Sequence, residues 1–174
     1  MPNHLSTLGI IHTVISILAL LTAFYSLTRF ARINPANGAG KAYILLTIIT
    51  CLTGLPIMKT GHPTPGHFLG VIILVLLPFG IFAKSIKPFG KGADYIQVFI
   101  LSLTLFFSCI PAIVETLTRL PIGHPIAANP NANVIQMGLV ILFTCFMAGV
   151  VYQIIKLKKT KSKARALSPL TNLG

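Results

Sequence analysis

The chain has 174 residues, of which 54% are hydrophobic and only 9% are charged. This composition is too apolar for a soluble domain and indicates a protein whose solvent is lipid. There are 14 lysines and arginines but only two acids, for a formal net charge of +12. The basic residues lie in short segments between apolar runs, which excludes a single nucleic-acid-binding face.

Five apolar runs follow one another along the chain and cover residues 8–27, 42–58, 67–83, 95–117 and 134–157. At about 17 to 24 residues, each run is long enough to cross a hydrocarbon core of about 30 Å, the two shortest only just. Segments rich in proline, glycine and asparagine separate the runs and supply turns. We therefore predict an all-α polytopic membrane protein in which residues 1–157 form a bundle of about five transmembrane helices. Residues 158–174 are predicted to be a flexible polybasic tail.

The basic residues predict how this bundle is oriented. Five crossings divide the connecting segments into two sides, one with 12 basic residues and the other with only Lys59 and Arg119. Because basic residues accumulate on the cytoplasmic side of membrane proteins, we expect the C-terminus in the cytoplasm and the N-terminus outside. The expected location is a bacterial inner membrane. The 12 residues are Arg29, Arg32, Lys41, Lys84, Lys87, Lys91, Lys156, Lys158, Lys159, Lys161, Lys163 and Arg165.

With this topology, all five histidines fall on or near the outer face: His4, His12, His62, His67 and His124. Glu115, near the outer end of the fourth run, joins them. Imidazole is the commonest side-chain ligand of transition metals, and carboxylates also bind them. The leading hypothesis is a periplasmic-face pocket for a copper, zinc or iron ion, or for haem b, with metal or redox handling as its role. Its expected metal ligands are His12, His67, His124 and Glu115.

Arg119 has a separate expected role in the same hypothesis. If the cofactor is haem, two imidazoles are the axial ligands and Arg119 binds a propionate. Arg119 also follows Glu115 by four residues on one helix face, so a salt bridge that only closes the helix is an alternative role for this pair.

Two hypotheses from other classes stand beside the metal or haem site. In the first, the protein is a small proton or cation channel or carrier that uses Glu115 and His12, because ionisable residues inside membranes commonly mark transport paths. In the second, it is an accessory or assembly subunit without a site of its own. The expected partners are the bilayer, anionic lipids at the C-terminal tail, and a homo-oligomer or a larger membrane complex. No motif of a soluble-type hydrolase or kinase is present, and no catalytic residue is assigned.

Two stripes of small and polar residues follow helical spacing. The stripe in the first run should pack against other helices, because small residues let backbones approach closely in lipid. A second stripe lies along the fourth apolar run. The first comprises His12, Ser16, Ala19, Ala23 and Ser26, and the second Thr104, Ser108, Pro111 and Glu115.

The segment from Ile110 to Gly123, with its E-T-x-T-R-L-P motif beginning at Glu115, resembles a stretch found in a family of uncharacterised small multi-pass bacterial membrane proteins. Weaker resemblance extends over most of the helical part, at residues 40–43, 52–57 and 66–67 and around His12. The resemblance implies a membrane-embedded helical fold and a candidate site between Glu115 and Pro121. It implies no particular reaction.

Overall fold

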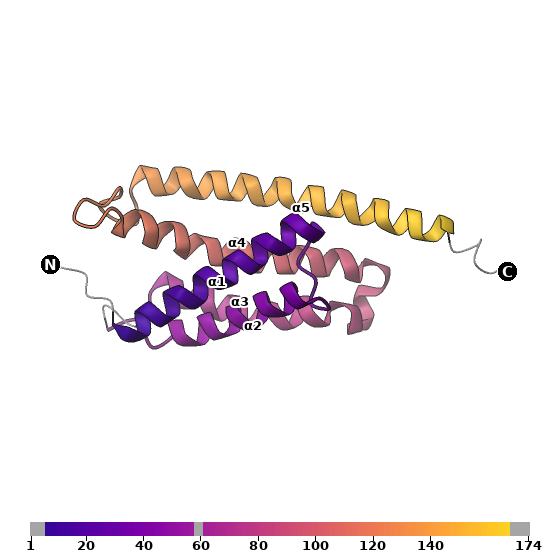
Figure 1. Cartoon of the computed structure of the whole chain (residues 1–174), viewed down its shortest axis with the longest axis horizontal. Coiled ribbons are helices and arrows are strands. Elements are labelled where there is room, and N and C mark those ends of the chain that lie inside the picture. The colour runs from indigo at the N-terminus through magenta and orange to yellow at the C-terminus, as the bar shows by residue number, and fades with distance from the viewer. Residues whose placement is uncertain (1–5, 58–60, 168–174) are drawn as a thin grey trace.

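The computed structural model describes residues 6–57 and 61–167 and contains five α-helices in that part of the chain, with no β-strand (Figure 1). His4, Met58 and Lys59 lie outside the described residues. Two short 3₁₀ helices, η1 (Ala83–Ser85) and η2 (Lys87–Gly92), connect the third and fourth helices. The five helices are α1 (Thr7–Phe30), α2 (Gly38–Gly54), α3 (Pro65–Phe82), α4 (Ala93–Arg119) and α5 (Asn133–Leu167).

Four of these helices, α1, α3, α4 and α5, are long and apolar enough to cross a membrane. The sequence-based prediction of an all-helical fold with apolar spans is confirmed to this extent. Large apolar side chains are exposed on the outside of every helix, as expected for surfaces that face hydrocarbon rather than water. Examples are Phe24, Leu45, Phe68, Phe99 and Val140.

Helix α2 is shorter than the other four and begins and ends about four residues earlier than predicted. Its 17 residues extend about 25 Å, less than a hydrocarbon core of about 30 Å. The Asn37 side chain sets its start by accepting a hydrogen bond from the Gly40 amide at 2.8 Å. Pro56 lies just past its end, where proline cannot continue the hydrogen-bond ladder. The second predicted run is therefore helical, with different bounds.

Helix α5 continues well beyond the predicted end of its membrane span. It remains helical to Leu167, so most of the tail predicted as flexible is an extension of α5, and residues 168–174 lie outside the described part. The helix packs along α4 (Figure 1). A buried hydrogen bond of 3.1 Å, from the Ser102 hydroxyl to Gln153 Oε1, joins the two helices.

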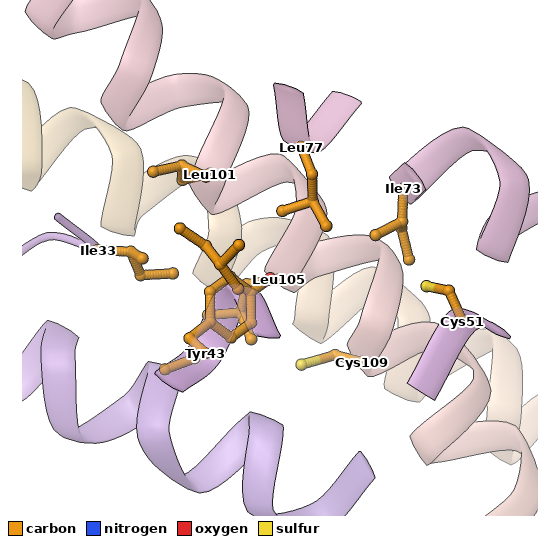
Figure 2. Close-up of a cluster of buried hydrophobic side chains, with 10 residues drawn as sticks. Ile33, Tyr43, Cys51, Ile73, Leu77, Leu101, Leu105 and Cys109 are labelled. Carbon is orange, nitrogen blue, oxygen red and sulfur yellow. The ribbon is translucent and has the colours of Figure 1, made fainter. Parts of the chain in front are cut away.

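The packed interior lies between α1, α2, α3 and α4. Figure 2 shows Tyr43, Leu101 and Leu105 close together at its centre, with Cys51 and Cys109 toward one side. The small residues Ala19 and Ala23 are buried on α1, which confirms the prediction that this stripe packs against other helices. The same interior also holds polar side chains, and these position the candidate site.

Candidate functional site

His12 joins α1 to the C-terminal end of α2. Its Nδ1 lies 3.2 Å from the Thr53 hydroxyl oxygen, which in turn lies 2.8 Å from the Ile49 carbonyl oxygen. A hydroxyl has one proton, and Thr53 directs it to the backbone of its own helix. Thr53 therefore accepts from Nδ1–H of His12, and Nε2 is the nitrogen left to accept a proton or bind a ligand.

Gly54 provides the space that the imidazole occupies. A Cβ atom at this position would lie 3.0 Å from His12 Cε1, closer than side-chain carbons normally approach. Glycine at this position therefore lets the ring lie directly against the backbone of α2. Thr53 and Gly54 together fix both the hydrogen bond and the position of the histidine.

Glu115 brings α4 to the same region. Its carboxylate forms an ion pair with Arg119 one helical turn later, and it interacts electrostatically with His12 across the bundle. The side chain is 51% exposed, whereas His12 is partly buried. Glu115 is therefore paired with Arg119 on α4 and lies within electrostatic range of His12 on α1.

His67 is engaged at the start of α3. Its Nδ1 accepts a hydrogen bond of 2.9 Å from the Thr64 backbone amide, which closes the first turn of the helix as the acid of a capping box would. This bond gives His67 a structural role that does not require a metal. Its Nε2 is buried without a hydrogen-bond partner among the described residues.

His124 lies in the loop between α4 and α5. Its side chain is exposed, and its backbone amide donates to the Pro121 carbonyl within a turn. In the described part of the chain, no three histidine, cysteine, aspartate or glutamate side chains are grouped so that they could hold a metal ion. The four predicted metal ligands are thus not brought together as one set.

A set of buried hydroxyl groups on three helices is here called the hydroxyl seam: Ser26 on α1, Tyr43, Thr47 and Thr50 on α2, and Thr104 on α4. Tyr43 and Thr104 are joined by a buried hydrogen bond of 2.9 Å. The Thr104 hydroxyl lies 2.9 Å from the Leu101 carbonyl and donates to it, so Tyr43 is the donor of the bond between helices. The hydroxyls of Thr47 and Ser108 lie near the same phenol oxygen.

Three members of the hydroxyl seam differ from the other hydroxyls of these helices. Serine and threonine in apolar helices usually donate to a carbonyl one turn earlier, as Ser16 and Ser108 do here at 2.7 and 2.9 Å. The buried hydroxyls of Ser26, Thr47 and Thr50 form no such bond of good geometry among the described residues. These three hydroxyls are therefore not engaged by the described backbone of their own helices, and that of Thr47 lies near the phenol of Tyr43 instead.

Part of the seam was visible in the sequence. The stripes through Ser26 and Thr104 follow helical spacing, but the contribution of α2 was missed. Its signal is the spacing of Tyr43, Thr47 and Thr50, four and three residues apart, which places all three on one helix face.

The comparisons with known proteins add no family: no family model, curated protein or solved structure matches the chain. The fold is all-helical in the described part of the chain, with four helices long and apolar enough to span a membrane and with several polar side chains buried among the apolar ones. The resemblance carried by the E-T-x-T-R-L-P motif remains a prediction.

Proposed function

We propose that this protein conducts protons across a bacterial inner membrane, through the hydroxyl seam and the His12–Glu115 pair. The observation that carries the proposal is the set of buried hydroxyls without intrahelical partners, Ser26, Thr47 and Thr50. Hydrocarbon offers no partner to a polar group, so such groups are costly inside a membrane and tend to mark transport paths. This is the channel or carrier function considered from the sequence.

The distance along the bundle over which these polar residues extend supports the proposal. Ser26 and His12 are 14 positions apart on α1, which corresponds to about 21 Å along the helix axis. A hydrocarbon core is about 30 Å thick. The polar residues therefore extend over about two thirds of the distance that a proton must cross.

The chemistry of each residue suits it to one step of the proposed proton transfer. Glu115, half-exposed at the rim, exchanges protons with water and is held in place by Arg119. His12 accepts a proton at Nε2, since Nδ1 already donates to Thr53. Hydroxyl groups both donate and accept, so the seam relays a proton by reorientation of its hydrogen bonds.

The proposed orientation has the C-terminal end of α5 in the cytoplasm and the N-terminus outside. The supporting observation is that the C-terminal ends of α1, α3 and α5 and the N-terminal ends of α2 and α4 lie at the same end of the bundle (Figure 1). All 12 basic residues of the larger group belong to these ends and their connections. The site at His12 and Glu115 then faces the periplasm.

Proton flux into liposomes tests the proposal. Purified protein is reconstituted with a pH-sensitive dye inside, and a potassium diffusion potential drives protons inward. We expect the Glu115→Gln and His12→Gln variants to reduce the flux at least about tenfold, because neither side chain can then exchange a proton at the rim. Wild-type flux no greater than that of empty liposomes, or undiminished flux in E115Q, would overturn the proposal.

Matched variants distinguish an effect on the proposed proton path from a general loss of protein stability. Thr47→Val removes a buried hydroxyl of the seam while nearly conserving its shape, whereas Thr144→Val removes an exposed one that donates to the Val140 carbonyl. T47V should lower the flux and T144V should not. Sodium or potassium flux in place of proton flux would favour the cation alternative instead.

The metal or haem hypothesis is supported by one pair of neighbouring groups, His12 and Glu115. A haem site would show a Soret band in the purified protein, and a metal site would show stoichiometric copper, zinc or iron by elemental analysis. Loss of that signal in H12Q, with the fold intact, would assign the group to this rim.

A further inference from the structure

At the opposite end of the bundle, a small groove lies between the C-terminal end of α1 and the part of α5 from Gln153 to Thr160. Its volume is about 160 Å³, and its lining includes two basic side chains, Arg32 and Lys156. Phe30 and Leu157 add apolar surface, and the buried side chain of Gln153 is also part of the lining. The groove is thus cationic, with an apolar part beside the charges.

Within the described part of the chain, neither acidic side chain pairs with the two positive charges of the groove. The whole chain contains only two acids, Asp94 and Glu115. Asp94 forms ion pairs with both Lys84 and Lys161, and Glu115 pairs with Arg119 at the other end of α4. An external anion is therefore the natural counter-ion for Arg32 and Lys156.

Gln153 adds a neutral donor. It is 6% exposed, and its Oε1 accepts the hydrogen bond from Ser102 on α4. Its amide nitrogen is consequently the group that remains to donate into the groove. A guanidinium, an ammonium and an amide together suit the several acceptor oxygens of a phosphate group.

The position of the groove favours a lipid as the source of that phosphate. Lys156 is the residue at which the apolar run of α5 gives way to its basic extension, and Arg32 occupies the same position after α1. Headgroups of the bilayer lie at this level, directly above the acyl chains that would contact Phe30 and Leu157. A free phosphate ion would gain no favourable contact from the apolar part of the lining.

We propose that this groove binds the headgroup phosphate of an anionic phospholipid, with Arg32 and Lys156 as the charged ligands. The site is separate from the proton path, and it differs from the general attraction of a polybasic segment to anionic lipid because it depends on two particular side chains. A bound lipid would also connect α1 to α5, which otherwise packs on α4.

Lipid titration of the purified full-length protein tests the proposal by native mass spectrometry. The three probes are short-chain phosphatidylglycerol, short-chain phosphatidylcholine and inorganic phosphate. We expect saturable binding of phosphatidylglycerol only. The double variant Arg32→Gln/Lys156→Gln should weaken it about twentyfold to thirtyfold, as expected for two charges at about 1 kcal/mol each.

Control variants keep the result interpretable. Lys163→Gln removes an exposed charge from the same extension and should change the affinity less than about twofold. Arg32→Lys retains the charge and should retain most of the binding even if Arg32→Gln disturbs the fold. Equal losses in K163Q and the double variant would overturn the specific site, and inorganic phosphate that binds and displaces the lipid would overturn a lipid source.

Discussion

The Tyr43 hydroxyl on α2 donates a hydrogen bond to Thr104 on α4 across 2.9 Å, and both side chains are completely buried. This bond connects two helices that are separated in the chain by α3. In hydrocarbon, association of helices depends on such hydrogen bonds and on close packing rather than on the hydrophobic effect. The same contact is the centre of the hydroxyl seam, so stability and the proposed proton path depend on one pair of residues.

Tyr43→Phe should lower both stability and proton flux. Loss of the hydroxyl removes the hydrogen bond between helices and costs about 1 kcal/mol of unfolding free energy. Denaturant titration in mixed micelles measures this cost, and the liposome assay measures the flux. Tyr25→Phe is the matched control because Tyr25 is exposed on α1. Equal fluxes of Y43F and wild type would remove Tyr43 from the path.

Gly54→Ala should displace the imidazole of His12. The new Cβ would lie 3.0 Å from Cε1, and relief of the contact must move either the ring or α1, at a cost of about 1–3 kcal/mol. We expect a lower melting temperature and reduced flux. Gly70→Ala on α3 places a methyl group in open space and should be neutral or slightly stabilising. Similar behaviour of the two variants would contradict the close approach of α1 and α2.

The fold was predictable from the sequence mainly because long apolar runs indicate membrane helices directly. Their ends were less predictable. The early end of α2 follows from Pro56. The prediction placed the end of this run at residue 58 because the residues around Pro56 are apolar. The helical extension of α5 is stabilised by Lys161, which pairs with Asp94 and lies over the Tyr95 ring at 5.0 Å. These partners are distant in the chain and cannot be inferred from the extension itself.

The candidate site was predictable where charge marks it. His12 and Glu115 stand out because ionisable residues are rare in apolar runs, and Arg119 stands out because it follows Glu115 by one helical turn. Thr53 and Gly54 do not, because their role depends on which residue of α1 lies against the C-terminal end of α2, and the sequence of α2 does not specify that contact. His67 was assigned to a metal although the spacing of Thr64 and His67 is that of a helix cap.

Asp94→Asn should loosen the extension of α5 without unfolding the bundle. The substitution removes the ion pairs to Lys84, at 2.8 Å, and to Lys161. Ion pairs at an exposed surface contribute about 0–1 kcal/mol each, so the global stability should change little. Hydrogen exchange in nanodiscs should nevertheless be faster at residues 158–167. Lys158→Gln, an exposed site on the same extension, provides the control, and unchanged protection in D94N would contradict this anchoring role.

Thiol labelling should place the two ends of α5 on opposite sides of the membrane. Ile122→Cys introduces a reactive site in the loop before α5, where the side chain is 90% exposed, and Lys163→Cys introduces one in the basic extension. Cys145 is replaced by serine in both because it is exposed on α5, whereas Cys51 and Cys109 are buried. In spheroplasts, an impermeant reagent should label I122C, and K163C only after permeabilisation. The reverse pattern would invert the orientation, and labelling of both from one side would show that α5 does not cross, because it is the one helix between them.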